Sequence, residues 1–161
     1  MKKTTVGMGL VLLVMLMMVV GCGSNGEVKE DMAAENQPQA EPEAEMVTTA
    51  SGLRYMDLVV GEGTPADNGM EVEVNYTLWL NENGEKGRKI DSSHDRNQLF
   101  PFTVGQPGLI AGWNEGMLGM MPGGTRRLYV PSDLGYGPNG RPPVIPGGAD
   151  LIFEIELVNI K

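Results

Sequence analysis

The chain has 161 residues, one cysteine, one histidine and a formal net charge of −9. This length allows one domain of modest size, and a single cysteine excludes an intramolecular disulfide. A lone histidine and a lone cysteine leave no basis for a histidine-rich metal site or a Cys–His nucleophile. The acidic balance argues against nucleic-acid binding, which needs clustered lysines and arginines.

The first segment has the composition of a secretion signal. Lys2 and Lys3 form a positively charged start, and an apolar run from Met8 to Val20 follows. The run is shorter than the about 20 residues of a membrane-spanning helix. The sequence "VVGC" resembles the lipobox of bacterial lipoproteins, in which the peptide is cut before the cysteine and the thiol is acylated, for example with palmitate. We therefore predict a signal peptide over residues 1–21 and lipidation of Cys22; the alternative is a conventional signal peptide.

A polar segment separates the cysteine from the rest of the chain. From Gly23 to Ala50 it carries seven acidic residues, the single lysine Lys29 and no aromatic residue. Such a segment cannot bury enough apolar surface to fold. We predict that residues 22–50 are the lipidated cysteine and a disordered acidic tether, followed by one domain over 51–161.

The domain mostly shows the alternation of antiparallel strands. In "EVEVNYTLWL", apolar residues occupy every second position from Val72 to Leu80, and polar residues fall between them. One face of this strand is predicted to be core and the other solvated. Similar alternation marks "LRYMDLVVG", "FPFTVG", "TRRLYVP" and "LIFEIELVNI". About five strands are therefore expected.

One segment, "GLIAGWNEGMLGMM", breaks the strand pattern. Its apolar residues at helical spacing are Leu109, Ile110, Trp113 and Met117. We predict one short helix here, ended by "PGG" from Pro122 and packed on the concave side of the sheet. Gly112 and Gly116 each lower the helix propensity by about 1 kcal/mol, so packing must hold the helix. They also allow it to lie close to the sheet.

A loop rich in proline and glycine, "LGYGPNGRPPVIPGG", runs from Leu134 to Gly148 with four prolines and five glycines. Proline restricts φ and glycine permits conformations closed to other residues, so the loop follows a defined path. We interpret it as a shaped flap over a pocket; the alternative is a surface loop without function.

Other catalytic patterns are weak. His94 lies in the polar run "DSSHDRNQ" and is expected to be a solvated loop residue. A carboxylate pair for glycoside hydrolysis stays open, but nothing singles out two of the fourteen acidic residues of the domain. "VGQPGLIAG" lacks both the GxGxxG pattern and the P-loop lysine, so it does not indicate a phosphate site.

Four blocks of the domain resemble, in order, the FKBP-type peptidyl-prolyl cis-trans isomerases. They are "VNYTLWL", "IDSSHDRNQLFPFTVG", "LIAGWNEGMLGM" with "GGTRRLYVPSDLGYG", and "RPPVIPGGADLIFEIELVNI". The resemblance runs from about Ser51 to Lys161. It implies an α+β fold, in which a strongly bent antiparallel sheet wraps around one short helix and an apolar pocket lies between them. It also implies rotation of X-Pro peptide bonds in polypeptides without a cofactor, metal or covalent intermediate.

The resemblance also implies the site residues. Those matched to catalytic positions are Tyr76, Asp91, Phe100, Ile110, Trp113, Tyr136 and Phe153. Those matched to substrate contacts are Ile90, Arg96, Leu109, Val144 and Ile145. Trp113 would form the floor between aromatic walls, with Asp91 and Tyr136 as polar contacts. Arg96 would pair with Asp91 or orient Tyr136, and the flap would close over the substrate.

Three features depart from the family pattern. Ile90 stands where well-known members carry an aromatic residue, which affects activity or the preferred residue before proline. "NENGEKGRK" is longer than in the minimal domain and predicts an extended hairpin turn. Arg141 and Pro143 alter the flap.

The predicted function is isomerisation of X-Pro bonds in polypeptides, assisting the folding of exported proteins. We expect a monomer, anchored through Cys22 to a membrane of the bacterial cell envelope, with proline-containing polypeptides as partners and no nucleic acid. The envelope location is the periplasmic face or outer membrane, or the cell surface in a single-membrane bacterium. The alternatives are a non-catalytic polypeptide-binding or chaperone module of the same fold and a structural envelope lipoprotein.

Overall fold

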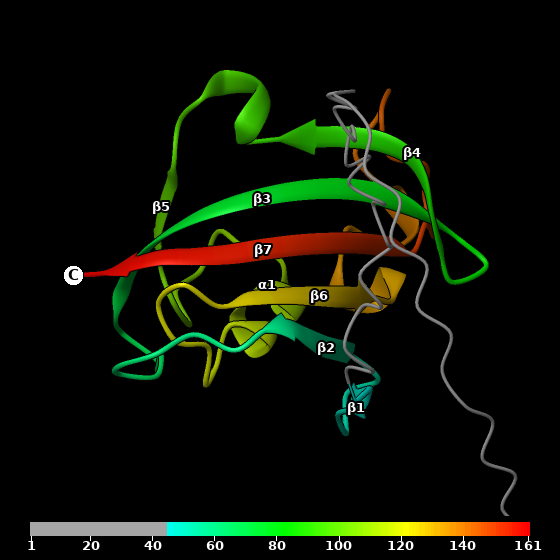
Figure 1. The fold of residues 1–161 in the computed structure, drawn as a ribbon. Helices are drawn as coiled ribbons and strands as arrows, with labels where there is room; N and C mark the ends of the chain where they lie inside the picture. The colour runs from blue at the N-terminus through cyan, green and yellow to red at the C-terminus, as the bar shows by residue number, and fades with distance from the viewer. Residues whose placement is uncertain (1–44) are drawn as a thin grey trace, which may run out of the picture. The chain divides into compact units, whose positions relative to one another are not determined.

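The computed structural model describes residues 45–161, and seven strands there form one antiparallel sheet. The strands are β1 (Val47–Thr48), β2 (Arg54–Val59), β3 (Glu71–Glu82), β4 (Glu85–Ser92), β5 (Phe100–Thr103), β6 (Thr125–Val130) and β7 (Leu151–Ile160). Their order in the sheet is β1-β2-β6-β7-β3-β4, and β5 pairs with the start of β3 (Figure 1).

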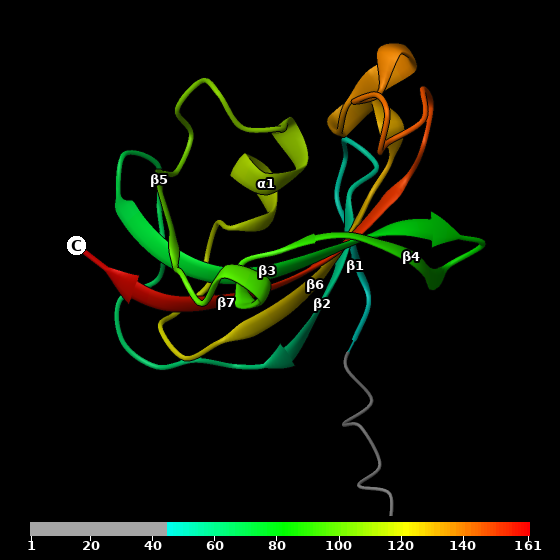
Figure 2. The ribbon, with the colours of Figure 1, turned by 90° about the horizontal axis from the view of Figure 1, so that it is seen from above.

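The helical segments are short. The described chain has one α-helix, α1 (Ala111–Gly116), and three 3₁₀ helices, η1 (His94–Arg96), η2 (Ser132–Leu134) and η3 (Gly137–Asn139). Figure 2 shows α1 on one face of the bent sheet. The segment between β6 and β7, drawn in orange, lies on the same side of the sheet near its opposite end. The predicted α+β fold, a bent sheet around one short helix, is confirmed.

The core follows the predicted alternation. In β3, the residues at alternate positions from Val72 to Leu78 are buried and their neighbours are partly exposed. In β7, Phe153, Ile155 and Leu157 are buried between the half-exposed glutamates. All five predicted strands are present, because burial of one sheet face selects apolar residues at every second position.

Two strands were not predicted. β1 is two residues long and pairs only with β2, so the ordered domain begins before Ser51, inside the segment predicted as tether. β4 is an edge strand, paired only with β3, and most of its first five residues are exposed and charged. An edge strand commonly carries charged side chains, which discourage pairing with another chain. In β4 these charges interrupt the alternation of apolar and polar residues from which the other strands were predicted.

The segment "NENGEKGRK" is also not the predicted extended turn. Only Asn83 and Gly84 form the turn, with φ of 59° and 96°, and the flanking residues belong to β3 and β4. Positive φ at both central residues is the requirement of a two-residue hairpin of type I′, which Asn-Gly satisfies. The insertion therefore lengthens two strands instead of a loop.

The helix is shorter than predicted. α1 ends at Gly116, and the residues from Met117 to Met121 form a turn and irregular chain. The amide of Gly119 donates to the carbonyl of Ala66 at 2.9 Å, and the amide of Ala66 donates to the carbonyl of Met120 at 2.7 Å. These bonds to a distant loop replace the helical bonds, so "PGG" ends the segment and not the helix.

Close packing of α1 on the sheet depends on its two glycines, as predicted. A Cβ at Gly112 would lie 2.6 Å from Cγ1 of Val130, and a Cβ at Gly116 would lie 2.6 Å from Cδ1 of Leu128. Both distances are far below van der Waals contact, so any side chain here would push the helix away from β6. The glycines thus offset their low helix propensity by permitting this contact.

A buried arginine holds the end of the helix. Arg126 of β6, with a side chain 7% exposed, donates to both carboxylate oxygens of Asp57 on β2, at 2.6 and 3.0 Å. Its guanidinium also donates to the carbonyls of Gly116 and Leu118, at 2.9 and 3.0 Å. The last carbonyls of a helix have no partner within it, so Arg126 satisfies acceptors that packing buries.

The predicted signal peptide, Cys22 and the tether up to residue 44 lie outside the described residues. Among residues 45–161, no helix combines the length and the apolar character needed to cross a membrane.

We expect Gly112→Ala to lower the free energy of unfolding by up to about 2 kcal/mol. Overpacking a filled site costs about 1–3 kcal/mol, which exceeds the about 1 kcal/mol that alanine adds in helix propensity. Denaturant unfolding followed by far-UV circular dichroism measures the change. The control is the same substitution in a Val130→Ala background, where the clashing methyl groups are gone. An equal loss in both backgrounds would contradict the packing argument.

Candidate active site

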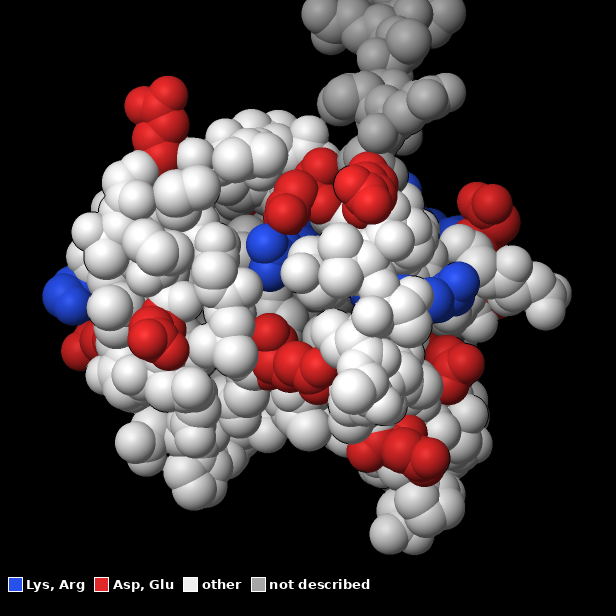
Figure 3. Space-filling model, turned by 90° about the horizontal axis from the view of Figure 1, so that it is seen from below, with Lys and Arg blue, Asp and Glu red and all other residues white. Residues whose placement is uncertain are grey.

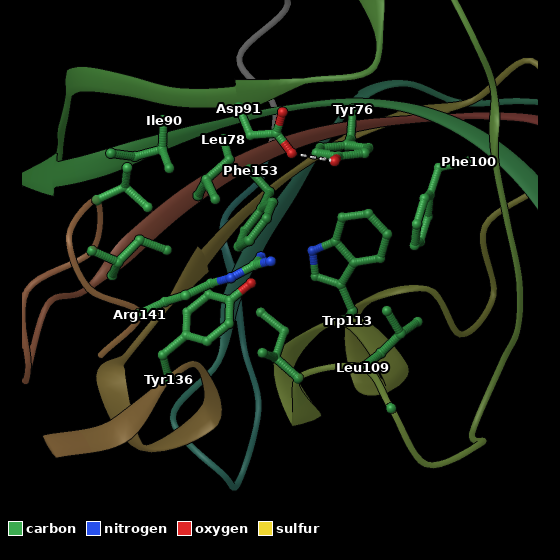
Figure 4. A pocket seen from close by; sticks show the side chains of 14 residues that line it. Tyr76, Leu78, Ile90, Asp91, Phe100, Leu109, Trp113, Tyr136, Arg141 and Phe153 are labelled. Carbon is green, nitrogen blue, oxygen red and sulfur yellow. Dashed lines mark hydrogen bonds between the residues drawn. The ribbon is translucent and has the colours of Figure 1, made fainter. Parts of the chain in front are cut away.

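A pocket of about 640 Å³ opens between the sheet, α1 and the segment from Tyr136 to Ile145. Its size is within the ordinary range for ligand sites, about 300–1,000 Å³. The residues that line it come from β3, β4, β5, β7, the helix start and the flap: Tyr76, Leu78, Ile90, Asp91, Phe100, Gly108, Leu109, Ile110, Trp113, Tyr136, Arg141, Val144, Ile145 and Phe153. Figure 4 shows their side chains converging from opposite sides.

Trp113 forms the floor of the pocket at the centre of a ring cluster. Its ring centroid lies 5.2 Å from that of Tyr76, 5.8 Å from Phe100 and 5.4 Å from Phe153, each nearly perpendicular to it. Edge-to-face pairs at these distances are favoured by the ring quadrupoles. Phe102 packs at 5.4 Å from Trp113 but lies outside the pocket lining, so it belongs to the core alone. The ring cluster therefore belongs to both the core and the site.

Trp113 also carries a buried donor at the floor. Its indole Nε1 is buried and has no hydrogen-bond partner among the described residues. In Figure 4 this nitrogen faces the side of the pocket that holds Phe153 and Arg141. A buried donor without a partner costs free energy, and because this nitrogen is closed to solvent it is not offered to a ligand in the pocket.

The flap closes the opposite wall by a short backbone hairpin. The amide of Arg141 donates to the carbonyl of Ile145 at 2.9 Å, and the amide of Ile145 donates back to the carbonyl of Arg141 at 3.0 Å. Arg88 of β4 donates to the carbonyl of Val144 at 2.7 Å, which ties the flap to the β3–β4 hairpin. Ile145 is buried, whereas Val144 is 39% exposed at the rim. The flap is thus held in place before any ligand binds.

One polar network forms the upper wall. The hydroxyl of Tyr76 donates to Asp91 Oδ2 at 2.5 Å, and Arg96 of η1 donates to Asp91 Oδ1. A second nitrogen of Arg96 donates to the hydroxyl oxygen of Tyr76 at 2.9 Å, and the amide of Ser92 donates to Asp91 at 2.9 Å. Every member of this network has a partner, so the carboxylate is held in one orientation.

The network shifts two pKa values. Burial opposes ionisation of Asp91, but the hydrogen bonds from Arg96 and Tyr76 and the charge of Arg96 outweigh it and lower the pKa of the carboxyl. Burial, together with the hydrogen bond to Asp91, raises the pKa of the Tyr76 phenol. At neutral pH the carboxylate is ionised and the phenol protonated, so neither group is poised to transfer a proton.

The structure brings together most of the residues that the sequence singled out. Eleven of the twelve line the pocket. The exception is Arg96, which reaches the pocket wall through Asp91 and Tyr76 and has no hydrogen bond to Tyr136 in the described domain. His94 is exposed in η1, as predicted.

Three lining residues were missed as contacts. Leu78 lies two residues after Tyr76 on the same face of β3, so the alternation already pointed to it. Gly108 precedes the helix and carries no side chain to signal a role. Arg141 was noted only as a departure in the flap, because a charge in a loop is ordinarily solvated.

Outside the pocket the domain is acidic. On the face that Figure 3 shows, acidic side chains outnumber basic ones, and no extended basic patch is visible there. That face therefore carries no row of basic side chains along which a phosphate backbone could lie.

A bent antiparallel sheet around one short helix, with an aromatic pocket between helix and flap, defines the class of the protein. The family model of the FKBP-type peptidyl-prolyl cis-trans isomerases matches residues 62–158. The chain belongs to this family, and its activity is cis-trans isomerisation of peptidyl-prolyl bonds.

Individual relatives agree with this assignment. The chain is 48% identical over 109 residues to an FK506-binding protein of Neisseria meningitidis serogroup B, covering 68% of this chain and 96% of the relative. It is 52% identical over 77 residues to the peptidyl-prolyl cis-trans isomerase FKBP2 of Mus musculus, covering 48% and 55% of the two chains.

Solved structures show the same fold. AtFKBP13 has a TM-score of 0.65 at 33% identity, with 73% of this chain and 99% of that chain covered. FkpA from Escherichia coli has a TM-score of 0.64, also at 33% identity, with 72% of this chain but only 51% of FkpA covered.

We expect the stability contributed by the Asp91 network to be lost in acid. The pKa of Asp91 is lowered in the folded state, so its contribution is complete above the unfolded value of about 3.9 and declines as the pH falls through the folded value. The free energy of unfolding, measured from pH 3 to 7, should show the wild type losing its advantage over Asp91→Asn only below about pH 4.

Glu85→Gln is the control, because it removes an exposed carboxylate of the same strand that has no ion pair in the described domain. A constant difference between wild type and Asp91→Asn across the whole range would contradict the assigned network.

Proposed function

We propose that this pocket is the site of isomerisation and that the proline ring of the substrate binds on Trp113. The observation that carries the proposal is the convergence of four aromatic rings on one floor beside a fixed carboxylate. A proline ring is apolar and compact, and the space bounded by Tyr76, Phe100 and Trp113 has matching chemistry. The other half of the pocket, lined by Leu78, Ile90 and the flap, then takes the residue before the proline.

The chemistry requires no nucleophile. Rotation about an X-Pro bond is opposed by amide resonance, with a barrier of about 18–20 kcal/mol, and takes tens to hundreds of seconds without a catalyst. In the twisted transition state the resonance is lost and the carbonyl is less dipolar. A pocket that removes water from this carbonyl thus disfavours the planar amide relative to the twisted one.

Each polar group then has a role in orientation. We assign the backbone of Ile110, at the start of α1, and the hydroxyl of Tyr136 to binding of the peptide carbonyls. Asp91 faces the twisted amide from the sheet side, held by Tyr76 and Arg96. These contacts accelerate rotation only as far as they favour the twisted bond over the planar one, and each tenfold gain needs about 1.4 kcal/mol.

We further propose that the protein acts in the bacterial cell envelope, anchored through lipid on Cys22. The support is the sequence alone: a charged start, an apolar run and "VVGC". Several acyl chains at about 0.8 kcal/mol per buried methylene hold a protein on a membrane. The acidic segment that follows would let a monomeric domain reach exported polypeptides while they fold.

The assigned role of Asp91 predicts that Asp91→Ala lowers the rate of catalysed isomerisation at least about tenfold while the domain stays folded, since a charged hydrogen-bonding group is worth about 1.5–3 kcal/mol. Exchange of a Leu-Pro peptide, followed by NMR with the full-length protein at catalytic concentration, measures the rate. Glu85→Ala is the matched control on the same strand. Full activity in Asp91→Ala with an unchanged melting curve would refute the role.

The anchor predicts a fatty acyl group on Cys22 as the first residue of the mature chain. Mass spectrometry of the N-terminal peptide detects the modification, and fractionation of cells follows the location. Cys22→Ser should move the protein from the membrane to the soluble fraction. Ser24→Ala, the control, should leave the protein in the membrane fraction. Unmodified Cys22 in a membrane-bound mature chain would rule out the lipid anchor.

A further inference from the structure

The flap places an arginine inside the pocket. Arg141 follows η3, and its backbone is fixed by the two hydrogen bonds with Ile145. Figure 4 shows its guanidinium reaching inward from the flap, between the rings of Tyr136 and Phe153. Arg141 stays exposed, so its charge is open to a bound ligand and is also screened by water and salt.

The charge of Arg141 is not balanced by the protein. Asp91 is the one carboxylate among the lining residues, and it is already paired with Arg96 and bonded to Tyr76. Among the ion pairs of residues 45–161, none includes Arg141 or Arg88, which donates to the flap carbonyl of Val144. The pocket therefore has a positive flap side although the domain as a whole is acidic.

The position of this charge relates it to one residue of the substrate. If the proline ring occupies the floor between Tyr76, Phe100 and Trp113, the flap half is left for the residue before the proline. Leu78, Ile90 and Val144 are lining residues, and Arg141 is the charged lining residue of the flap. In Figure 4 its guanidinium ends between the rings of Phe153 and Tyr136, between Leu78 and Trp113. A side chain with an aliphatic stem and a carboxylate end matches these walls.

We propose that Arg141 makes this isomerase select substrates with an acidic residue, above all glutamate, immediately before the proline. The inference rests on the proposed function of the pocket. The methylene groups of the glutamate side chain would lie against Leu78 and Ile90. Its carboxylate would accept two parallel hydrogen bonds from the guanidinium, the geometry in which arginine binds carboxylates best.

The test compares three peptides that differ at one position: Ala-Glu-Pro-Phe, Ala-Gln-Pro-Phe and Ala-Leu-Pro-Phe. Glutamine matches glutamate in shape without the charge, so the ratio of kcat/KM for Glu-Pro to that for Gln-Pro isolates the charge. Exchange NMR with the full-length protein gives each value. In the wild type we expect a ratio of about five at low salt, which falls as added salt screens the pair.

Variants assign the ratio to Arg141. Arg141→Gln should bring the ratio to about one, and Arg141→Lys should restore part of it. Arg141→Glu should reverse the preference, so that Ala-Lys-Pro-Phe is turned over faster than Ala-Gln-Pro-Phe. Arg54→Gln, which removes an arginine of β2 that is outside the pocket lining, should leave both the ratio and the activity unchanged.

The outcomes separate this inference from the function on which it rests. A wild-type ratio near one, or a high ratio that persists in Arg141→Gln, would overturn the role of Arg141 while catalysis of Leu-Pro exchange remained. No acceleration of any of the three peptides by the folded protein would overturn the assignment of the pocket itself, and the selectivity with it.

Discussion

The close approach of α1 to β6 is the constraint on which the site depends. Gly112 and Gly116 leave no side chain between the helix and the buried Val130 and Leu128. The helix therefore settles deep enough for Trp113 to meet the rings of Tyr76, Phe100 and Phe153, which come from the far side. The same contacts that fill the core also form the floor of the pocket, so stability and binding depend on one cluster of side chains.

The polar groups of the site divide into a paired set and an unpaired one. Asp91, Tyr76 and Arg96 satisfy one another and fix the wall on the sheet side. A fully paired network of this kind costs little to keep in an apolar setting and moves little during binding. Arg141 on the flap has no such partner, so it is available to a substrate. Isomerisation depends on a pocket of the right shape that removes water from the peptide carbonyl. In our proposal, selection among substrates depends on Arg141 of the flap.

Prediction from the sequence succeeded where a local residue pattern has a single physical cause, such as burial of one face of a strand. Alternation identified β3 and β7 because one face of each is buried, and it reached Leu78 as well as Tyr76. It failed at β4, an edge strand whose charged residues follow no alternation, and at the helix end, where bonds from Ala66 to Gly119 and Met120 replace helical ones. These outcomes are decided by partners far away along the chain, which a local pattern does not contain.

The blocks of the sequence determined the family, the α+β class and the identity of most pocket residues, since local propensity, apolar spacing and family motifs are properties of short segments. Tertiary structure alone decided which polar groups are paired. Arg96 reaches Asp91 and Tyr76 instead of Tyr136, and the exposed Arg141 reaches from the flap toward the rings of Tyr136 and Phe153. Whether a charge is paired or free depends on distances of a few ångströms between segments that are distant in sequence, and only the folded chain sets those distances.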